Sequence, residues 1–321
     1  MTARVFIDGE VGTTGLQISA RLEGRDDVEL LHLADEERKD PAKRADLLNA
    51  ADLVILCLPD DAAIEALRLI DNPAVKVIDA STAHRTDPDW VYGMAEYAPE
   101  QPGLIAEASR VTNPGCYAIG AIALIRPLVS RGVLPADSPV TINAISGYSG
   151  GGRKLIEAYE DPESSGYVDS TYRAYALSLE HKHTEEMRVH GLLAKRPLFV
   201  PSVGRFRQGM MVQVPLQLWA LPGSPSAGDL HEVLADYYDG QSFITVAGLA
   251  ATAAIEHLDP EALNGTNELR LHVFGNDTHE QAVLVAVLDN LGKGASGSAV
   301  QNMNLMLDLA PQAGLETRLV A

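Results

Sequence analysis

The first part of the chain alternates short apolar runs with helical stretches, and this alternation constrains the fold more than any other feature. The apolar runs are RVFID (4–8), VELLHL (28–33), residues 53–58 and VKVIDAS (75–81). Strands that alternate with helices form parallel sheets wound in βαβ units. Apolar runs without polar alternation are typical of strands covered on both faces. We therefore predict an α/β unit with a parallel sheet.

The pattern changes after residue 116, where the apolar runs become longer and more alternating. Five such runs are expected to be strands: VTINAIS (140–146), PLFVPSV (197–203), MMVQVPLQLWA (210–220), FITVAG (243–248) and LRLHVFG (269–275). Helical stretches are expected at 176–194, 227–239 and 296–310. This mixture predicts a second, α+β domain with a mixed or antiparallel sheet.

Charge and hydrophobicity limit the partners of the chain. Its 321 residues are 46% hydrophobic, and 25 basic against 44 acidic side chains give a net charge of −19. This argues against nucleic acid and anionic membrane as main partners, because phosphate binding depends on clustered Lys and Arg. The N-terminus has no signal-peptide pattern, and runs such as 118–125 are too short to span a bilayer. We therefore expect a cytoplasmic protein.

The chain has two cysteines, which rules out a disulfide framework and a Cys-rich zinc site. Cys57 lies in the apolar run LVILCLP and is expected to be a buried structural thiol. Cys116 follows Asn113-Pro114-Gly115 and precedes a helical stretch. A thiol at a helix N-terminus is shifted toward the nucleophilic thiolate. A small buried residue in the first helical turn is the alternative, and the residues alone leave both open.

A glycine-rich turn follows the first strand. GEVGTTG (9–15) connects a strand to a helix, the context that a phosphate-binding turn requires. An ordinary strand–helix turn is the alternative. Residues 35–37 after the second strand are acidic, and Arg38 and Lys39 are basic. An acidic group there favours NAD and a basic pair favours NADP, so the pattern leaves the dinucleotide open.

Histidines cluster in EHKHTEE (180–186). His183 and Glu186 are three residues apart and share a face if the segment is helical, so that the carboxylate can orient or charge the imidazole. A metal site of the HxHxxE type and a solvated, charged helix start are the alternatives.

Two loops are candidates for ligand contact. SGYSGGGRK (146–154) suggests a close approach of the backbone to a ligand, with a flexible loop as the alternative. DASTAHR (79–85) follows a strand of the parallel sheet, at the edge where such sheets bind ligands. Arg85 in this loop is expected to clamp an anionic substrate.

Taken together, the motifs resemble one enzyme family. They occur in the order GEVGTTG, DASTAHR, TNPGCYA, SGYSGGGRK, HKHTEEM, PSVGRFRQGM and GASGSAVQNMN. This set resembles the shorter subtype of N-acetyl-γ-glutamyl-phosphate reductase, within the aspartate-semialdehyde-dehydrogenase-like group. The resemblance implies an NADP-binding Rossmann-like domain over 1–115 and 296–321, and an α+β catalytic and oligomerisation domain over 116–295. It also implies a homo-oligomer, either a dimer or a tetramer.

The resemblance implies roles for individual residues. Cys116 is the expected nucleophile, His183 the acid/base and Glu186 its support, and no metal is expected. The expected cofactor-binding residues are Gly9, Gly12, Thr13, Thr14, Gly15, Arg38, Lys39, Ser81 and Asn302. The expected substrate-binding residues are Arg85, Asn113, Ser149 and Gly150. Ala95 stands in YGMAE where the family often has proline, which puts the local loop geometry in doubt.

The implied reaction is the NADPH-dependent reduction of an acyl phosphate through a cysteine thioester, in arginine biosynthesis. A sister enzyme for aspartyl or aminoadipyl phosphate is the nearest alternative, although the aspartate enzymes usually carry a QNC-type cysteine segment in place of NPGC. A non-catalytic NADP-binding sensor is a further alternative. It gives no reason for Cys116, the histidine cluster and Arg85 to occur together.

Overall fold

The chain divides into two compact units. The computed structural model describes residues 2–34, 36–37 and 40–315. Unit 1 comprises the residues up to Pro114 together with the segment that begins at Ala295, and unit 2 runs from Gly115 to Gly294. The chain therefore leaves unit 1 directly before Cys116 and returns to it after Gly294.

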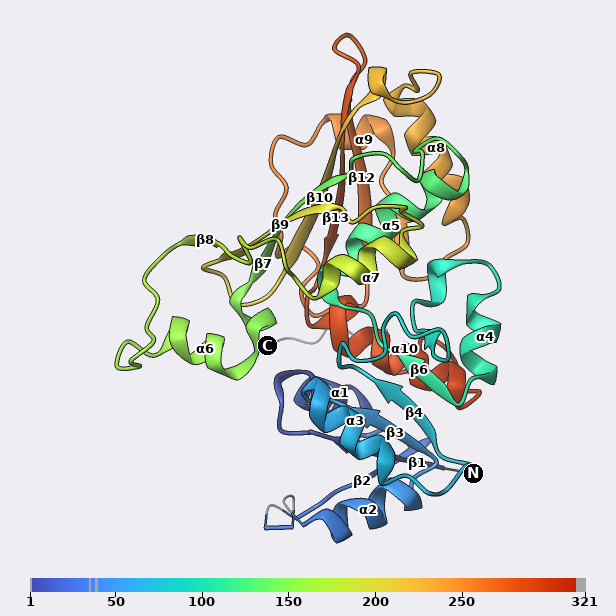
Figure 1. Ribbon diagram of the computed structural model, residues 1–321, viewed down its shortest axis with the longest axis vertical. Helices are drawn as coiled ribbons and strands as arrows, with labels where there is room; N and C mark the ends of the chain where they lie inside the picture. Colours follow the sequence, from blue (N-terminus) through green and yellow to red (C-terminus); the bar gives the residue numbers. More distant parts are fainter. Residues whose placement is uncertain (1, 35, 38–39, 316–321) are drawn as a thin grey trace. The chain divides into compact units, whose positions relative to one another are not determined.

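Unit 1 is built on a six-stranded sheet with the strand order β2-β1-β3-β4-β6-β5, in which every pair is parallel (Figure 1). This confirms the predicted α/β class with a parallel sheet. Its strands are β1 (Ala3–Asp8), β2 (Val28–Leu31), β3 (Leu53–Leu56), β4 (Lys76–Asp79), β5 (Val91–Tyr92) and β6 (Arg110–Thr112). Its helices are α1 (Thr13–Leu22), α2 (Pro41–Ala50), α3 (Asp60–Arg68), α4 (Gln101–Glu107) and α10 (Gly297–Met306).

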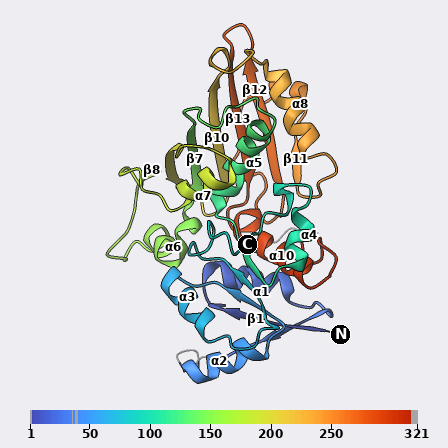
Figure 2. The same cartoon turned by 45° about the vertical axis from the view of Figure 1, so that its right-hand side comes forward.

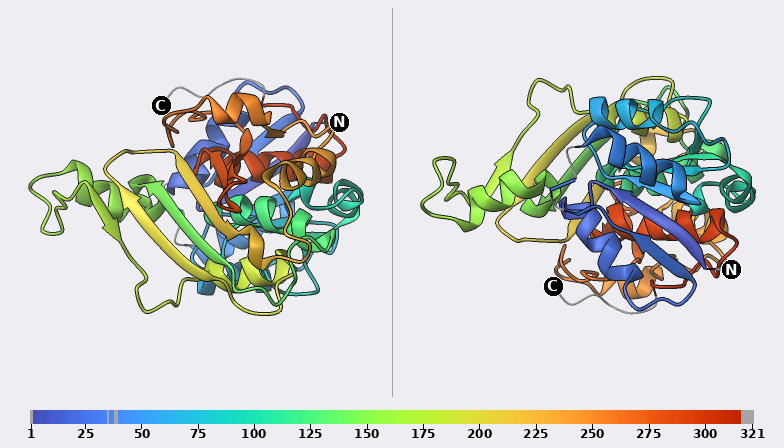
Figure 3. Two further views of the ribbon diagram at one scale, coloured as in Figure 1. Left: turned by 90° about the horizontal axis from the view of Figure 1, so that it is seen from above. Right: turned by 90° about the horizontal axis from the view of Figure 1, so that it is seen from below.

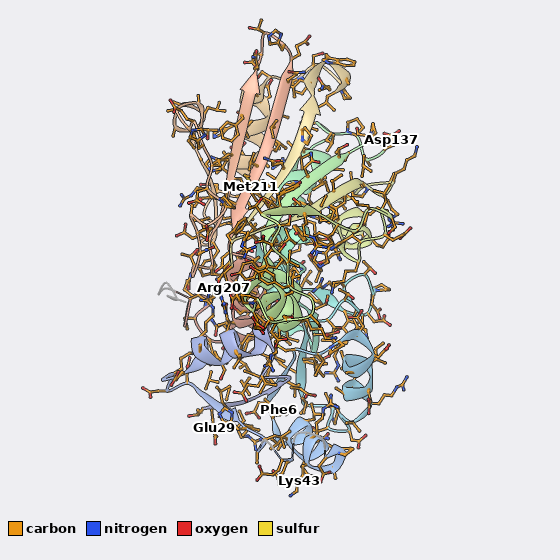
Figure 4. The ribbon with its side chains drawn as sticks, turned by 90° about the vertical axis from the view of Figure 1, so that its left-hand side faces the viewer. Phe6, Glu29, Lys43, Asp137, Arg207 and Met211 are labelled. Carbon is orange, nitrogen blue, oxygen red and sulfur yellow. The ribbon has the colours of Figure 1, made fainter. Side chains whose placement is uncertain are left out.

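Helices cover this sheet because its strands are apolar on both faces. Phe6 of β1 (labelled in Figure 4) packs in one buried cluster with Leu48 of α2 and Ala66 of α3. Elsewhere in the unit α10 contacts α1, α4 and β4, as the view from below in Figure 3 (right) shows for the red helix beside the blue strands. The C-terminal helix is thus part of the parallel-sheet unit.

Unit 2 contains a seven-stranded sheet with the order β11-β12-β13-β10-β7-β9-β8. The β7–β9 and β11–β12 pairs are parallel and the others antiparallel, which confirms the predicted mixed sheet. Its strands are β7 (Thr141–Gly147), β8 (Tyr172–Ala174), β9 (Leu198–Gly204), β10 (Met210–Gln217), β11 (Ile244–Val246), β12 (Leu269–Asn276) and β13 (Gln281–Leu288). Its helices are α5 (Cys116–Ser130), α6 (Gly152–Glu160), α7 (His183–His190), α8 (Ala227–Tyr237) and α9 (Leu249–Ala253).

The buried helix α5 packs against this sheet. It contacts β10, β13, α7 and α8 (Figure 2). Gly120 allows the close approach, because a Cβ there would lie 3.0 Å from Cγ2 of Val212. Successive strand residues point to opposite faces, so Met211 (labelled in Figure 4) faces away from α5. It packs there beside the buried Val285 and Val287.

The structure differs from the sequence prediction in one helical segment and in several strands. The segment 176–182, predicted to be helical, is not, and Ala176 (φ 50°) and Leu179 (φ 62°) adopt left-handed conformations that a right-handed helix does not contain. The short strands β5, β6 and β8 and the inner strand β13 were not predicted. Within the described residues, no helix combines the length and apolarity needed to cross a bilayer.

Candidate active site

The glycine turn after β1 is tightly closed. Gly9 has φ +92°, and a Cβ there would lie 2.4 Å from the carbonyl oxygen of Cys57. The N–H of Gly12 donates to the carbonyl of Gly9 (2.9 Å), and a Cβ on Gly15 would lie 2.6 Å from that same carbonyl oxygen. Helix α1 then begins at Thr13. The glycines are therefore required by close packing of the turn. The N-cap Gly12 makes no side-chain hydrogen bond to the first turn of α1, so that turn has the form of a phosphate-binding helix start.

Asn302 on α10 is a buried side chain with a specific orientation. Its Nδ2 donates to the carbonyl of Gly93 (2.8 Å) and to Oδ1 of Asn113 (3.2 Å). Its Oδ1 has no hydrogen-bond partner among the described residues. A buried acceptor without a donor costs free energy unless a ligand supplies one. Asn302 therefore fits a ligand with an amide or hydroxyl donor.

The loop after β4 is organised by Asp79, which is fully buried. Its carboxylate accepts from the N–H and hydroxyl of Ser81 (both 2.8 Å) and contacts Nδ1 of His84 at 2.7 Å. The His84 ring stacks on Trp90 with the centroids 4.4 Å apart. Ser81, expected to bind cofactor, thus has its hydroxyl proton engaged with Asp79. The Asp79–His84 pair was not predicted, although an aspartate at a strand end followed by a histidine is visible in the sequence.

Arg85 and Asn113, the expected substrate contacts, meet each other. Nε of Arg85 donates to the Asn113 carbonyl and Nη2 to the Ala80 carbonyl, both at 3.0 Å. Nδ2 of Asn113 donates to the Ala295 carbonyl at 2.9 Å. Both side chains are buried. Their hydrogen bonds connect the ends of β4 and β6 with the start of the C-terminal segment. Asn113 lies three residues before Cys116 in the sequence.

Cys116 is the first residue of α5. The preceding Gly115 has extended backbone angles (φ −75°, ψ 144°) and forms the N-cap, so the thiol lies on the first turn, where helical N–H groups lack intrahelical acceptors. Gly294 packs directly on the cysteine, since a Cβ on Gly294 would lie 2.8 Å from Cβ of Cys116. A thiol in this position is close to the positive end of the helix dipole.

Cys57 has a different environment. Burial, followed by the nearby carboxylates of Asp8 and Asp79, raises its pKa to about 12. It is therefore a protonated thiol at neutral pH, although Cys57 is half-buried and not fully buried as the sequence predicted.

His183 and Glu186 lie on α7, three residues apart, and both are buried. Oε1 of Glu186 accepts a 2.8 Å hydrogen bond from the N–H of Gly115. Because Gly115 immediately precedes Cys116, this bond attaches the helix that carries His183 to the start of the helix that carries the thiol. The sequence pattern suggested Glu186 as a support for His183 and did not predict its bond to Gly115.

The loop 146–154 is an ordered turn followed by α6. Gly147 packs against the backbone of Arg207, since its Cβ would lie 2.6 Å from the carbonyl oxygen there. Ser149 is buried, and its Oγ accepts from Nδ2 of Asn290 (3.0 Å). A Cβ on Gly150 would lie 3.1 Å from Oγ of Ser146. Packing within unit 2 thus accounts for these small residues.

Two expected cofactor-binding residues and the alternative of a metal site are still to be placed. Arg38 and Lys39, expected at the NADP 2′-phosphate, lie outside the described residues. Among the residues that the structure describes, no group of three His, Cys, Asp or Glu side chains is arranged to hold a metal ion.

Comparisons with known proteins identify the family. The semialdehyde dehydrogenase NAD-binding domain matches residues 4–104, and the semialdehyde dehydrogenase dimerisation domain matches residues 116–290. An N-acetyl-γ-glutamyl-phosphate reductase of Burkholderia cenocepacia is 56% identical over 309 residues, which covers 96% of this chain and 98% of that protein. The chain belongs to the N-acetyl-γ-glutamyl-phosphate reductase family. It is an oxidoreductase of the semialdehyde dehydrogenase type, as the resemblance implied.

Other relatives agree with this placement. An N-acetyl-γ-glutamyl-phosphate reductase 2 of Nostoc is 51% identical over 318 residues and covers 97% of this chain and 99% of its own length. A probable aspartate-semialdehyde dehydrogenase of Pseudomonas aeruginosa has the same fold, with a TM-score of 0.70 at 17% identity over 96% of this chain and 99% of that one. Unit 1 is accordingly a nicotinamide-dinucleotide-binding unit. The glycine turn lies at the junction of the first strand and the first helix, where such units bind pyrophosphate.

Proposed function

We propose that the protein reduces N-acetyl-γ-glutamyl phosphate to N-acetylglutamate 5-semialdehyde with NADPH and releases inorganic phosphate, as a step of arginine biosynthesis. The observation that carries the proposal is the placement of Cys116 on the first turn of α5, hydrogen-bonded through Gly115 to the helix that bears His183. A reductase of an acyl phosphate needs a nucleophile with a nearby proton carrier, and these two helices supply both.

The first half of the reaction is an acyl transfer. Sγ of Cys116 bonds to the acyl carbon of the substrate, the bond from that carbon to the phosphate oxygen breaks, and inorganic phosphate leaves. His183 takes the thiol proton and passes it to the departing phosphate. The N–H groups of the first turn of α5 point toward the reacting carbonyl in this scheme and stabilise the negative charge that develops on its oxygen.

The second half reduces the thioester. Bound NADPH supplies a hydride to the thioester carbon. His183, reprotonated from solvent after phosphate leaves, protonates the resulting oxyanion and takes the proton back as the carbon–sulfur bond breaks and the aldehyde is released. The same proton then passes from His183 to the departing sulfur and restores the Cys116 thiol. The covalent link holds the acyl group at the site of reduction between the first and the second half of the reaction.

The chemistry is tested in the direction of semialdehyde oxidation. We expect NADPH to form only when N-acetylglutamate 5-semialdehyde, inorganic phosphate and NADP are all present. Aspartate 4-semialdehyde serves as the matched control substrate and is expected to react far more slowly. Equal or faster turnover of aspartate 4-semialdehyde would instead assign the protein to the sister reaction.

We also propose that the protein binds NADP in preference to NAD and acts in the cytoplasm. The basic pair Arg38 and Lys39 follows the second strand, where charge selects between the two dinucleotides. Neutralising both, as Arg38→Gln/Lys39→Gln, is expected to weaken binding of NADPH but not of NADH. Equal losses for both cofactors would exclude these residues as the source of the preference.

We further propose a homo-oligomer built on the second face of the unit 2 sheet. Half-buried residues of this face, among them Met211, Phe274 and Val283, pack around the cluster of Val285 and Val287. Unit 2 matches a domain described as a dimerisation domain. Light scattering is expected to give a dimer or tetramer, and Met211→Glu is expected to shift it toward the monomer. A monomeric wild-type protein would contradict the proposal.

A further inference from the structure

The N-terminus of α7 is capped in an unusual way. Its N-cap residue, Lys182, makes no side-chain hydrogen bond to the first turn. The N–H of His183 instead donates to Nδ1 of His181 at 3.1 Å. The ring of His181 therefore holds the backbone of the residue to which we assign the acid/base role.

This hydrogen bond defines the tautomer of His181. Nδ1 accepts a hydrogen bond from a backbone N–H, so Nδ1 itself is not protonated. A neutral imidazole then carries its proton on Nε2. Nε2 faces the hydroxyl of Tyr175 across 3.4 Å, a long hydrogen bond in which the tyrosine oxygen accepts. The two ring nitrogens thus serve two different partners.

A chain of hydroxyl groups continues from Tyr175. Tyr175 and Tyr117 are hydrogen-bonded to each other, and the Tyr117 hydroxyl donates to the carbonyl of Ser202 at 3.0 Å. His181, the Tyr175 and Tyr117 hydroxyls and the Ser202 carbonyl thus form one hydrogen-bonded series. Burial raises the pKa of Tyr175 to about 12, so its hydroxyl keeps its proton at neutral pH.

Aromatic rings fix the plane of the His181 imidazole. The ring of His181 meets the ring of His183 edge-on, with centroids 4.7 Å apart and planes at 78°. Phe199 and Tyr117 also meet it edge-on, at 5.1 and 5.8 Å. The segment that joins Tyr175 to His181 contains the left-handed residues Ala176 and Leu179, a strained backbone of the kind found where a structure fixes a functional side chain.

We propose that His181 is a positioning residue for His183, and that its neutral Nε2–H tautomer, fixed by Tyr175, sets the orientation of the His183 imidazole toward the thiol of Cys116. This inference rests on the proposed acid/base role of His183. His181 itself touches neither substrate nor cofactor in this scheme. Its contribution is to hold the first turn of α7 in place.

Two matched variants test the proposal. In His181→Asn, Oδ1 of the new side chain occupies a place similar to Nδ1 and can accept from the N–H two residues on, as in an Asx-turn. In His181→Gln, the polar end corresponds to Nε2 and cannot reach that N–H. We expect His181→Asn to keep kcat within about threefold and His181→Gln to lose about 100-fold in kcat with KM unchanged, because small misplacements of a catalytic group have effects of that size.

A measurement independent of turnover accompanies the kinetics. Long-range proton–nitrogen NMR of the labelled wild-type protein distinguishes the two imidazole tautomers, and the His181 signals are identified by their loss in His181→Asn. We expect a protonated Nε2 and an unprotonated Nδ1. The opposite tautomer, or equal kcat in the two variants, would overturn the positioning role. A wild-type protein without turnover would contradict the proposed function instead.

Discussion

The N–H of Gly115 donates a 2.8 Å hydrogen bond to Oε1 of Glu186. Gly115 is the N-cap of the helix that begins with Cys116, and Glu186 lies one turn after His183 on α7. Hence a single hydrogen bond joins the turn that presents the thiol to the helix that presents the imidazole. The carboxylate also places negative charge at the N-terminus of α5, where the helix dipole favours it.

Removing this carboxylate is expected to loosen both helices. Glu186→Ala leaves the buried N–H of Gly115 without its acceptor and should lower the free energy of unfolding by about 1–3 kcal/mol. Glu186→Gln keeps an oxygen that can accept and should retain most of the stability. Both are measured by denaturant unfolding, with kcat determined in parallel and expected to fall further in Glu186→Ala.

The neighbouring Glu185 provides the control. It is largely exposed and pairs with Arg188, which lowers the Glu185 pKa. Glu185→Ala therefore removes an exposed ion pair worth less than about 1 kcal/mol. Equal destabilisation by the alanine variants at 185 and 186 would show that the Gly115 contact contributes nothing specific.

The two cysteines are expected to differ in reactivity. With a pKa of about 12, Cys57 has almost no thiolate near pH 8, whereas the thiol of Cys116 lies at a helix N-terminus. Iodoacetamide should modify the native wild-type protein at Cys116 alone, and Cys116→Ser should remain unmodified on the same time scale. Mass spectrometry of the digested protein locates the label.

The pH dependence of the Cys116→Ser variant sharpens this test. In this variant Cys57 is the remaining cysteine. Its pKa is raised to about 12, so the labelling rate of Cys57 should increase about tenfold for each pH unit as the pH rises toward that value. Because Cys57 is half-buried, rapid labelling at pH 8 would mean that its pKa lies well below about 12. The same variant should bind NADPH normally while its turnover is lost.

The sequence predicted much of the fold but only part of the site. The apolar periodicity located most strands because the parallel sheet is buried on both faces, and the glycine turn was recognisable because Gly9 and Gly15 have no room for a Cβ. The bond from Gly115 to Glu186 could not be predicted, because it joins residues 71 positions apart in sequence. The helix predicted over 176–182 was wrong because contacts of Tyr175 and His181 set the strained turn there, and no local sequence pattern reveals these contacts.

The glycine turn makes a direct prediction about packing. A methyl group at Gly15 would lie 2.6 Å from the carbonyl oxygen of Gly9, so Gly15→Ala must shift the turn. We expect a loss of stability of at least about 1–3 kcal/mol, typical of overpacking, together with weaker NADPH binding. Fluorescence titration with NADPH and thermal unfolding measure the two effects.

Gly103 is a matched control for Gly15. It also lies within a helix, α4, but a Cβ there meets no atom within 4 Å. Gly103→Ala should be neutral or stabilise the protein by up to about 1 kcal/mol, since alanine is the better helix former. If Gly15→Ala behaved like Gly103→Ala, the turn would be less tightly closed than its contacts indicate.

Asn302 and Asn304 lie two residues apart on α10, and variants of the two distinguish a proposed ligand-binding amide from a structural one. Both are buried and donate through Nδ2 to backbone carbonyls, but Oδ1 of Asn304 accepts from Arg25 (3.0 Å) while Oδ1 of Asn302 is left open. Both alanine variants should therefore unfold at lower temperature. Only Asn302→Ala should also lose NADPH affinity, by about tenfold, which corresponds to about 1.4 kcal/mol for one hydrogen bond to the cofactor. Unchanged NADPH affinity in a folded Asn302→Ala protein would mean that the open oxygen faces no part of the cofactor, and equal losses in both variants would trace the effect to α10 as a whole.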